Sequence, residues 1–196
     1  DVLLTIHIDL DANLKENIFV LQQNSFALNG LELKLDGSVE MPDSADMIFD
    51  LSYATNNTEF KSLLSLVPAI YMTDFEGLKT SGNLALNGTV KGTLGDEHTP
   101  DVKGKLAVKN ANFSYPDLPK SAENINIDMD YFYDGRQMDN TTLDINKFHI
   151  EMGGNPVDIV LNLKTPISDP FINSQIKANL DLASIIDVIP LEGTEL

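Results

Sequence analysis

The chain has 196 residues and no cysteine. The absence of cysteine excludes disulfide scaffolds, thiol nucleophiles and cysteine-based zinc sites, although it does not fix the compartment. Basic residues are scarce, with 13 Lys and Arg against 30 Asp and Glu and a formal net charge of −17. Such a charge repels phosphate backbones and anionic membrane surfaces, so the sequence predicts no nucleic-acid binding. Any contact with lipid has to be hydrophobic.

Long apolar runs are also missing. No run of about 18 or more apolar residues occurs, so the sequence predicts no transmembrane segment. The opening residues, Asp1 to Thr5, lack the basic region of a signal peptide. We interpret the chain as a piece excised from a larger protein, with its membrane anchor expected upstream.

Recognisable catalytic and metal-binding motifs are absent as well. There is no GxSxG, SxxK, GxGxxG or phosphate-binding loop pattern. The histidines at 7, 98 and 149 lack metal-ligand spacing, and the aspartates at 128, 130 and 134 do not match a calcium loop. We therefore expect no catalytic residue, no metal site, no cofactor and no enzymatic activity.

What the sequence does contain is period-two alternation of apolar and polar residues. Runs such as Ile125 to Tyr133, Val157 to Leu163 and Ile172 to Leu180 alternate in this way and are separated by Gly-, Asn- and Pro-rich turns. One aliphatic face and one polar face are typical of antiparallel sheet. Near Lys147 the alternation slips by one residue, which predicts a β-bulge. The predicted fold is mainly β: a long, antiparallel, strongly twisted or groove-forming sheet with two short amphipathic helices.

Those helices belong to an internal repeat of about 122 residues. Each predicted helix, at about 57–67 and 181–189, has four apolar residues at i, i+3, i+4 and i+7 and is followed by proline. The apolar residues are Phe60, Leu63, Leu64 and Val67 in the first helix, and Leu182, Ile185, Ile186 and Ile189 in the second. We divide the chain into a first repeat portion (1–68), a full repeat (69–190) and the start of another (191–196), in one continuous structural unit.

The aliphatic face of the predicted sheet has to be covered. It either packs against a second sheet in a closed core, or it lines an open trough that acyl chains cover, and periodicity leaves both possibilities open. The residues predicted to face this interior are Ile127, Met129, Val157, Ile159, Leu161, Ile176 and Leu180.

Three motifs in order resemble the AsmA-like C-terminal region. They are a short helix before Pro68, the strand Gly82-Asn-Leu84-Ala-Leu86-Asn-Gly88-Thr-Val90-Lys-Gly92, and the segment Lys109-Asn-Ala-Asn-Phe-Ser-Tyr-Pro116. The acidic, asparagine-rich style is similar to Bacteroidetes-type members. The resemblance implies a Gram-negative periplasmic protein tethered to the inner membrane and related to bridge-like lipid transfer proteins with a repeating β-groove.

We therefore predict a non-catalytic segment that lines a hydrophobic groove for phospholipid transport between the two membranes, or that serves outer-membrane assembly. Its expected partners are phospholipid acyl chains and other envelope proteins. The alternative is a closed β scaffold, or an interaction module that binds outer-membrane assembly partners through an open strand edge.

Overall fold

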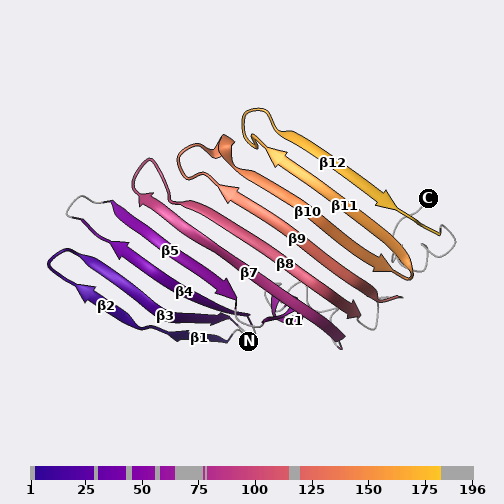
Figure 1. The fold of residues 1–196 in the computed structure, drawn as a ribbon, viewed down its shortest axis with the longest axis horizontal. Coiled ribbons are helices and arrows are strands. Elements are labelled where there is room, and N and C mark those ends of the chain that lie inside the picture. The colour runs from indigo at the N-terminus through magenta and orange to yellow at the C-terminus, as the bar shows by residue number, and fades with distance from the viewer. Residues whose placement is uncertain are drawn as a thin grey trace.

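The computed structural model describes residues 3–28, 31–42, 46–55, 58–64, 77, 79–114 and 120–181; the side chains of Leu63 and Leu64 lie outside this description. The described residues form one open antiparallel sheet of twelve strands with a short α-helix and a 3₁₀ turn (Figure 1). The prediction of a mainly β, antiparallel fold is thus confirmed. The sheet is a single layer, without a second sheet packed on it among these residues.

The strands follow one another across the sheet nearly in chain order. The path runs β1-β3-β4-β5-β7-β8-β9-β10-β11-β12, with β2 beside β3 and β6 beside β7. The bounds are β1 Leu4–His7, β2 Leu10–Asn13, β3 Ile18–Leu28, β4 Leu31–Glu40, β5 Met47–Thr55, β6 Thr58–Glu59, α1 Phe60–Leu64, β7 Lys79–Leu94, β8 Asp101–Ser114, β9 Ala122–Tyr133, η2 (a 3₁₀ turn) Met138–Asn140, β10 Thr142–Met152, β11 Asn155–Lys164 and β12 Phe171–Ala178.

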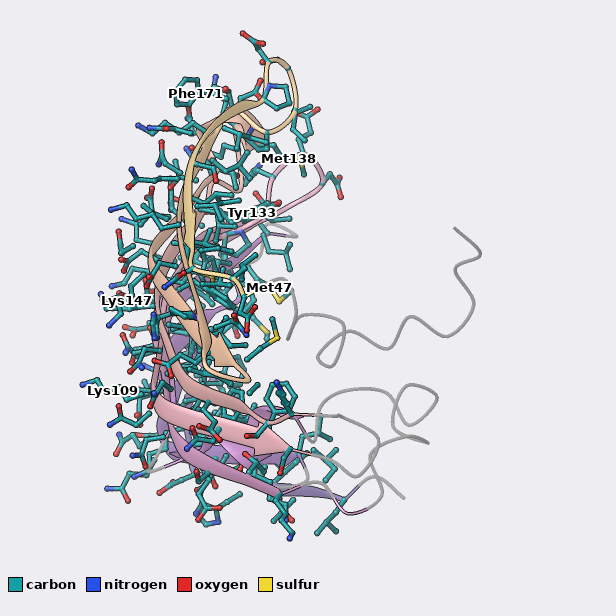
Figure 2. The ribbon with its side chains drawn as sticks, turned by 90° about the vertical axis from the view of Figure 1, so that its right-hand side faces the viewer. Met47, Lys109, Tyr133, Met138, Lys147 and Phe171 are labelled. Carbon is teal, nitrogen blue, oxygen red and sulfur yellow. The ribbon has the colours of Figure 1, made fainter. Side chains whose placement is uncertain are left out.

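The sheet has two chemically different faces. Met47 and Tyr133 project from one face, and Lys109 and Lys147 from the opposite face (Figure 2). We call these the apolar face and the outer face. The sheet curves, and the apolar face lies on the inside of the curve. Because side chains alternate along each strand, the pairing register decides which residues share a face.

Bulges on three adjacent strands bend one end of the sheet. The register shifts near Gly82 in β7, Asn110 in β8 and Asn124 in β9, and all three residues have positive φ, at 109°, 49° and 52°. Gly82 approaches β8 so closely that a Cβ there would overlap Ala111. The bulge predicted near Lys147 is confirmed, since the pairing of β10 with β11 shifts between Ile145 and Phe148. Bulges of this kind increase local bend and twist.

The buried core lies at this bent end. Its members are Leu31, Phe60, Leu84, Val108, Ala111, Ala122 and Ile125, all with at most 7% of their surface exposed. Phe60, the first residue of α1, inserts the helix into this cluster. A five-residue helix is not stable alone, so this burial is what holds α1 in place.

The helix predictions need correction. The first predicted helix, at about 57–67, begins later than expected, because Thr58 and Glu59 pair with Leu84 and Asn83 of β7 as strand β6. Backbone pairing with β7 therefore overrides the helical pattern up to Phe60. Val67 and the predicted second helix, with Leu182, Ile185, Ile186 and Ile189, lie outside the described residues. Asp181, the expected first residue of that helix, has no helical assignment.

Apolar and polar residues also alternate in the sequence from Val2 to Leu10, a pattern typical of one continuous strand, but the described residues of this segment belong to two strands, β1 and β2. Asn24, with no exposed surface, accepts a hydrogen bond from the Asp9 N–H (2.8 Å) and donates one to the Asp9 carbonyl (3.0 Å). The Asp9 carbonyl also accepts a hydrogen bond from the Gln22 N–H (3.2 Å), so Asp9 is held at the bulge of β3 and outside the regular ladder. Strand β1 therefore ends at His7 and β2 begins at Leu10. Asn24 itself lies at the bulge in β3, after Leu21.

Strands β3, β4 and β5 recur structurally as β10, β11 and β12. In the first set Phe19 pairs with Val39, and Val39 with Phe49; in the second Leu143 pairs with Leu163, and Leu163 with Ile172. The corresponding residues are therefore displaced by 124, 124 and 123 positions. Both β3 and β10 carry a bulge at the matching place, before Asn24 and Phe148. The proposed repeat boundaries themselves stay a prediction.

Candidate functional site

The apolar face is the candidate site, and the strand register makes it continuous. Consecutive partners in one row across β7 to β12 are all aliphatic or aromatic. The row consists of Leu84, Val108, Ile127, Phe148, Ile159 and Ile176. The bulge after Ile145 keeps the row in phase, since it returns Phe148 to the face that Ile145 occupies. Without that extra residue, the following part of β10 would present its polar side here.

Six of the seven residues predicted to face the interior lie on this face. Ile127 and Met129 come from β9, Val157, Ile159 and Leu161 from β11, and Ile176 from β12. The seventh residue, Leu180, follows the end of β12, is 42% exposed and has no strand partner in the register. The structure thus brings together the predicted set except for Leu180, while contact with lipid stays a prediction.

Burial along the apolar face falls steeply away from α1. Val108 is 1% exposed beside the helix, whereas Ile176 on the last described strand is 65% exposed. At the opposite end of the sheet, Leu4, Ile6 and Leu10 are about half exposed, at 49–58%. Apolar side chains on both flanks are therefore open to an occupant. Exposed apolar surface of this extent marks a binding surface in most proteins.

A pair of tyrosines crosses the middle of the apolar face. Tyr53 on β5 and Tyr131 on β9 occupy one row with Gly88 on β7 and Gly104 on β8. Their hydroxyl oxygens lie 2.5 Å apart, and the Tyr53 hydroxyl also donates to the carbonyl of Lys103 (3.1 Å). Sequence reasoning missed this pair. The available signal was two glycines in the interior of β7 and β8, which indicates that something packs closely over them.

The outer face is held by ion pairs and amide hydrogen bonds. Lys105 lies 3.0 Å from Asp128 and 3.6 Å from Asp130. The hydrogen bond and charge of Asp128, with the charge of Asp130, raise the pKa of Lys105. These pairs are solvent-exposed, so each contributes little to stability. Asp128 and Asp130 therefore lie on a solvent-exposed face, with Lys105 between them.

The three histidines do not converge. His149 lies on the outer face between two carboxylates, at 2.7 Å from Asp158 and 3.4 Å from Glu151. His7 is in β1 and His98 is in the loop after β7. Within the described ranges, no group of three or more His, Asp or Glu side chains is arranged to hold a metal ion. None of the helices in that part of the chain is long and apolar enough to cross a membrane.

Two aspartates organise the loops at one end of the sheet. Asp134 accepts hydrogen bonds from the Asn140 side chain and from the backbone N–H groups of Gln137 and Arg136, which lower its pKa. Asp139 accepts from the N–H groups of Ser168 (2.9 Å) and Ile167 (3.1 Å) and so ties the β9–β10 loop to the β11–β12 loop. The carboxylate of Asp134 is thus used within its own loop.

The Asp139 contact predicts a pH dependence of stability. The Ser168 hydrogen bonds, followed by that from Ile167, hold the pKa of Asp139 below its ordinary 3.8. A carboxylate with a lowered folded-state pKa stabilises the fold above its unfolded pKa and loses that effect as pH falls through the folded pKa. Asp139→Asn should therefore lower the thermal unfolding midpoint at about pH 7. The difference from the unsubstituted chain should shrink as pH falls below 3.8 and through the lowered pKa of the native carboxylate.

The control for this measurement is Asp96→Asn, in the loop after β7. Among the residues that the structure describes, no hydrogen bond of that carboxylate joins two loops in the way that Asp139 does, so the midpoint difference for Asp96→Asn should be small throughout. A midpoint difference for Asp139→Asn that does not decrease as pH falls below 3.8 would contradict the role of the charge.

Comparison with known families matches residues 21–193 to the model of the TamB C-terminal domain. The matched range runs from β3 to beyond β12 and covers most of the chain. No curated protein and no solved structure gives a significant match.

Proposed function

The chain belongs to the TamB C-terminal domain family, and we propose that it is a non-catalytic segment whose apolar face receives phospholipid acyl chains. The family implies a role in outer-membrane protein assembly or in lipid transport in the cell envelope. It is of the AsmA/TamB type that the sequence resemblance indicated, whereas the AsmA-like name and the Bacteroidetes-type origin stay predictions. A periplasmic location fits the family, and tethering of the parent protein to the inner membrane is part of the proposal.

The observation that carries the proposal is the continuous apolar face of an open, single-layer sheet. From Leu84 on β7 to Ile176 on β12, each strand contributes an apolar partner to the same row. The described residues cover this row with protein only near α1, where Phe60 packs. A sheet with one such face is stable in water only when something removes that face from solvent.

Acyl chains suit this face better than charged or polar occupants. The face itself is aliphatic, while the charged residues Lys105, Asp128 and Asp130 lie on the outer face. The net charge of −17 gives no electrostatic attraction to anionic head groups. Binding would therefore depend on apolar area, and the curvature of the sheet places that area on its inner side (Figure 2).

Site-specific photo-crosslinking in the full-length parent, in its native envelope, tests the proposal. One photoreactive residue would replace Ile176 on the apolar face, and a second would replace Val160 on the outer face. Both native side chains are aliphatic and exposed, at 65% and 47%, on neighbouring strands, so they differ mainly in the face they occupy. We expect phospholipid adducts at position 176 and none at position 160.

Equal lipid adducts at the two positions would indicate non-specific contact and contradict a specific apolar face. Absence of lipid adducts at position 176 in folded protein would also reject the proposal.

A second candidate function is protein binding through the edge of the sheet. Every residue of β12 is exposed, and β11 is its sole strand partner among the described residues. Its structural counterpart β5 pairs on both sides, with β4 and β7. Protein adducts in place of lipid adducts at position 176 would favour this alternative, in which an extended segment of an assembly partner adds to the sheet.

A further inference from the structure

Tyr53 and Tyr131 form a link across the sheet that does not use the backbone ladder. In the pairing register Tyr53 is opposite Gly88, Gly88 is opposite Gly104, and Gly104 is opposite Tyr131. The two aromatic side chains therefore come from strands that are separated by two others. Their hydroxyl groups meet above those two intervening strands, with 2.5 Å between the oxygens.

The glycines make this meeting possible. A Cβ on Gly104 would overlap the ring of Tyr131, and a Cβ on Gly88 would overlap the carbonyl of Lys103 and crowd the Tyr53 hydroxyl. Any other residue at either position would lift the tyrosine rings off the sheet. The space over two strands is thus filled by side chains from the two flanking strands.

The hydrogen bonds of the pair have one consistent arrangement. Each phenol has a single proton, and the Tyr53 hydroxyl donates its proton to the Lys103 carbonyl at 3.1 Å. The Tyr131 hydroxyl therefore donates to the Tyr53 oxygen. The hydroxyl protons of Tyr53 and Tyr131 are both used in hydrogen bonds within the link. The two tyrosines therefore add no unpaired hydroxyl donor to the apolar face.

The link lies where it can affect the shape of the whole sheet. It spans β5 to β9 near the middle of the strand path, with β3 and β4 on one side and β10 to β12 on the other. Backbone hydrogen bonds fix the spacing of adjacent strands but leave the angle between them free to vary, as the range of twist in sheets shows. A bond between the first and fourth of four successive strands restricts the sum of those angles.

We propose that the Tyr53–Tyr131 link is a crossbar that sets the curvature of the middle of the sheet and thereby positions the apolar face. A role of the link in lipid binding rests on the proposed function, whereas its effect on the curvature of the sheet does not depend on that function. Burial raises the pKa of Tyr53, in keeping with a phenol that keeps its proton in the link.

Distance measurements between spin labels test the crossbar without any lipid. Because the chain has no cysteine, Lys34→Cys on β4 and Lys164→Cys on β11 provide two unique labelling sites. Both positions are exposed and lie next in sequence to Leu35 and Leu163, which flank the tyrosine row. Double electron–electron resonance on the otherwise intact chain then reports the distance across the middle of the sheet.

Tyr131→Phe removes the hydroxyl-to-hydroxyl bond, and Tyr53→Phe removes both that bond and the bond to Lys103. We expect the distance distribution to broaden and its mean to shift in Tyr131→Phe, and to do so further in Tyr53→Phe. The matched control is Tyr133→Phe, which removes a hydroxyl that contacts Thr99 in the loop after β7 (3.0 Å) and should leave the distribution unchanged.

A second measurement separates the crossbar from a general loss of packing. The circular dichroism spectrum of Tyr131→Phe should match that of the unsubstituted chain, so that a shifted distance distribution reflects the lost hydroxyl-to-hydroxyl bond and not a general loss of packing. Distance distributions in both link variants that match the unsubstituted chain would overturn the proposal. Because no lipid enters these experiments, that failure would leave the proposed lipid function untouched, and a failed crosslinking experiment would leave the crossbar untouched.

Discussion

Replacing Phe60 with alanine is expected to lower the free energy of unfolding by about 3–5 kcal/mol. Phe60 is 6% exposed and joins α1 to a cluster that includes Leu31, Leu84 and Val108. Removing the ring leaves a cavity at the bent end of the sheet and also releases the helix, because five residues do not form a stable helix without tertiary contacts. The loss is comparable with the whole stability of many domains, about 5–15 kcal/mol.

Urea denaturation followed by circular dichroism measures this effect. Ile48→Ala is the matched control, because Ile48 is apolar but 39% exposed on the outer face of β5. It should cost less than about 1 kcal/mol, since little surface is buried there. Similar losses for the two variants would show that the cluster around Phe60 is not the main core of this chain.

Introducing two aspartates into the apolar face by substitution is expected to reduce the association of phospholipid with the protein at least about tenfold. Ile159 and Ile176 are direct partners across β11 and β12, so Ile159→Asp with Ile176→Asp places two carboxylates together on the proposed lipid surface. Acyl chains cannot solvate these charges, and the penalty for each at the centre of a hydrocarbon layer is about 2.5–3.5 kcal/mol. The readout is phospholipid recovered per mole of full-length protein purified from its envelope.

The matched control shifts both substitutions by one residue, to Val160→Asp with Gln175→Asp. Val160 and Gln175 are also direct partners on β11 and β12, but they lie on the outer face. This variant adds two carboxylates as well, so it should retain phospholipid association. Equal loss in the two variants would mean that net charge, and not the face, controls the association, which would contradict the proposed binding surface.

Much of this architecture is readable from sequence because side-chain direction along a strand has a period of two. The alternation from Val157 to Leu163 correctly predicts the face of each residue in β11, and the slip near Lys147 correctly predicts the bulge in β10. Both are local properties of an extended backbone, so neighbouring residues contain the information. The mainly β, antiparallel fold follows from the same patterns.

Predictions that involve competition between local and distant partners are less successful. The helical pattern around Phe60 predicts a helix over about 57–67, but the described part of this range contains only the five-residue α1, and Thr58 and Glu59 pair with β7 because a strand partner is available there. Likewise, the alternation through Ile8 is interrupted because Asn24, fifteen positions after Asp9, bonds to its backbone. A window of neighbouring residues contains neither partner.

The sequence by itself therefore determined the mainly β, antiparallel fold, the two faces of its strands and six of the seven predicted residues on the apolar face. Only the tertiary structure decided that the sheet stays open as a single layer, because periodicity is the same whether protein or lipid covers an apolar face. The tertiary structure also decided the Tyr53–Tyr131 link, since its members are 78 positions apart and meet only through the register of four strands. The register across four strands depends on every intervening turn and bulge together, so no single window of neighbouring residues predicts it.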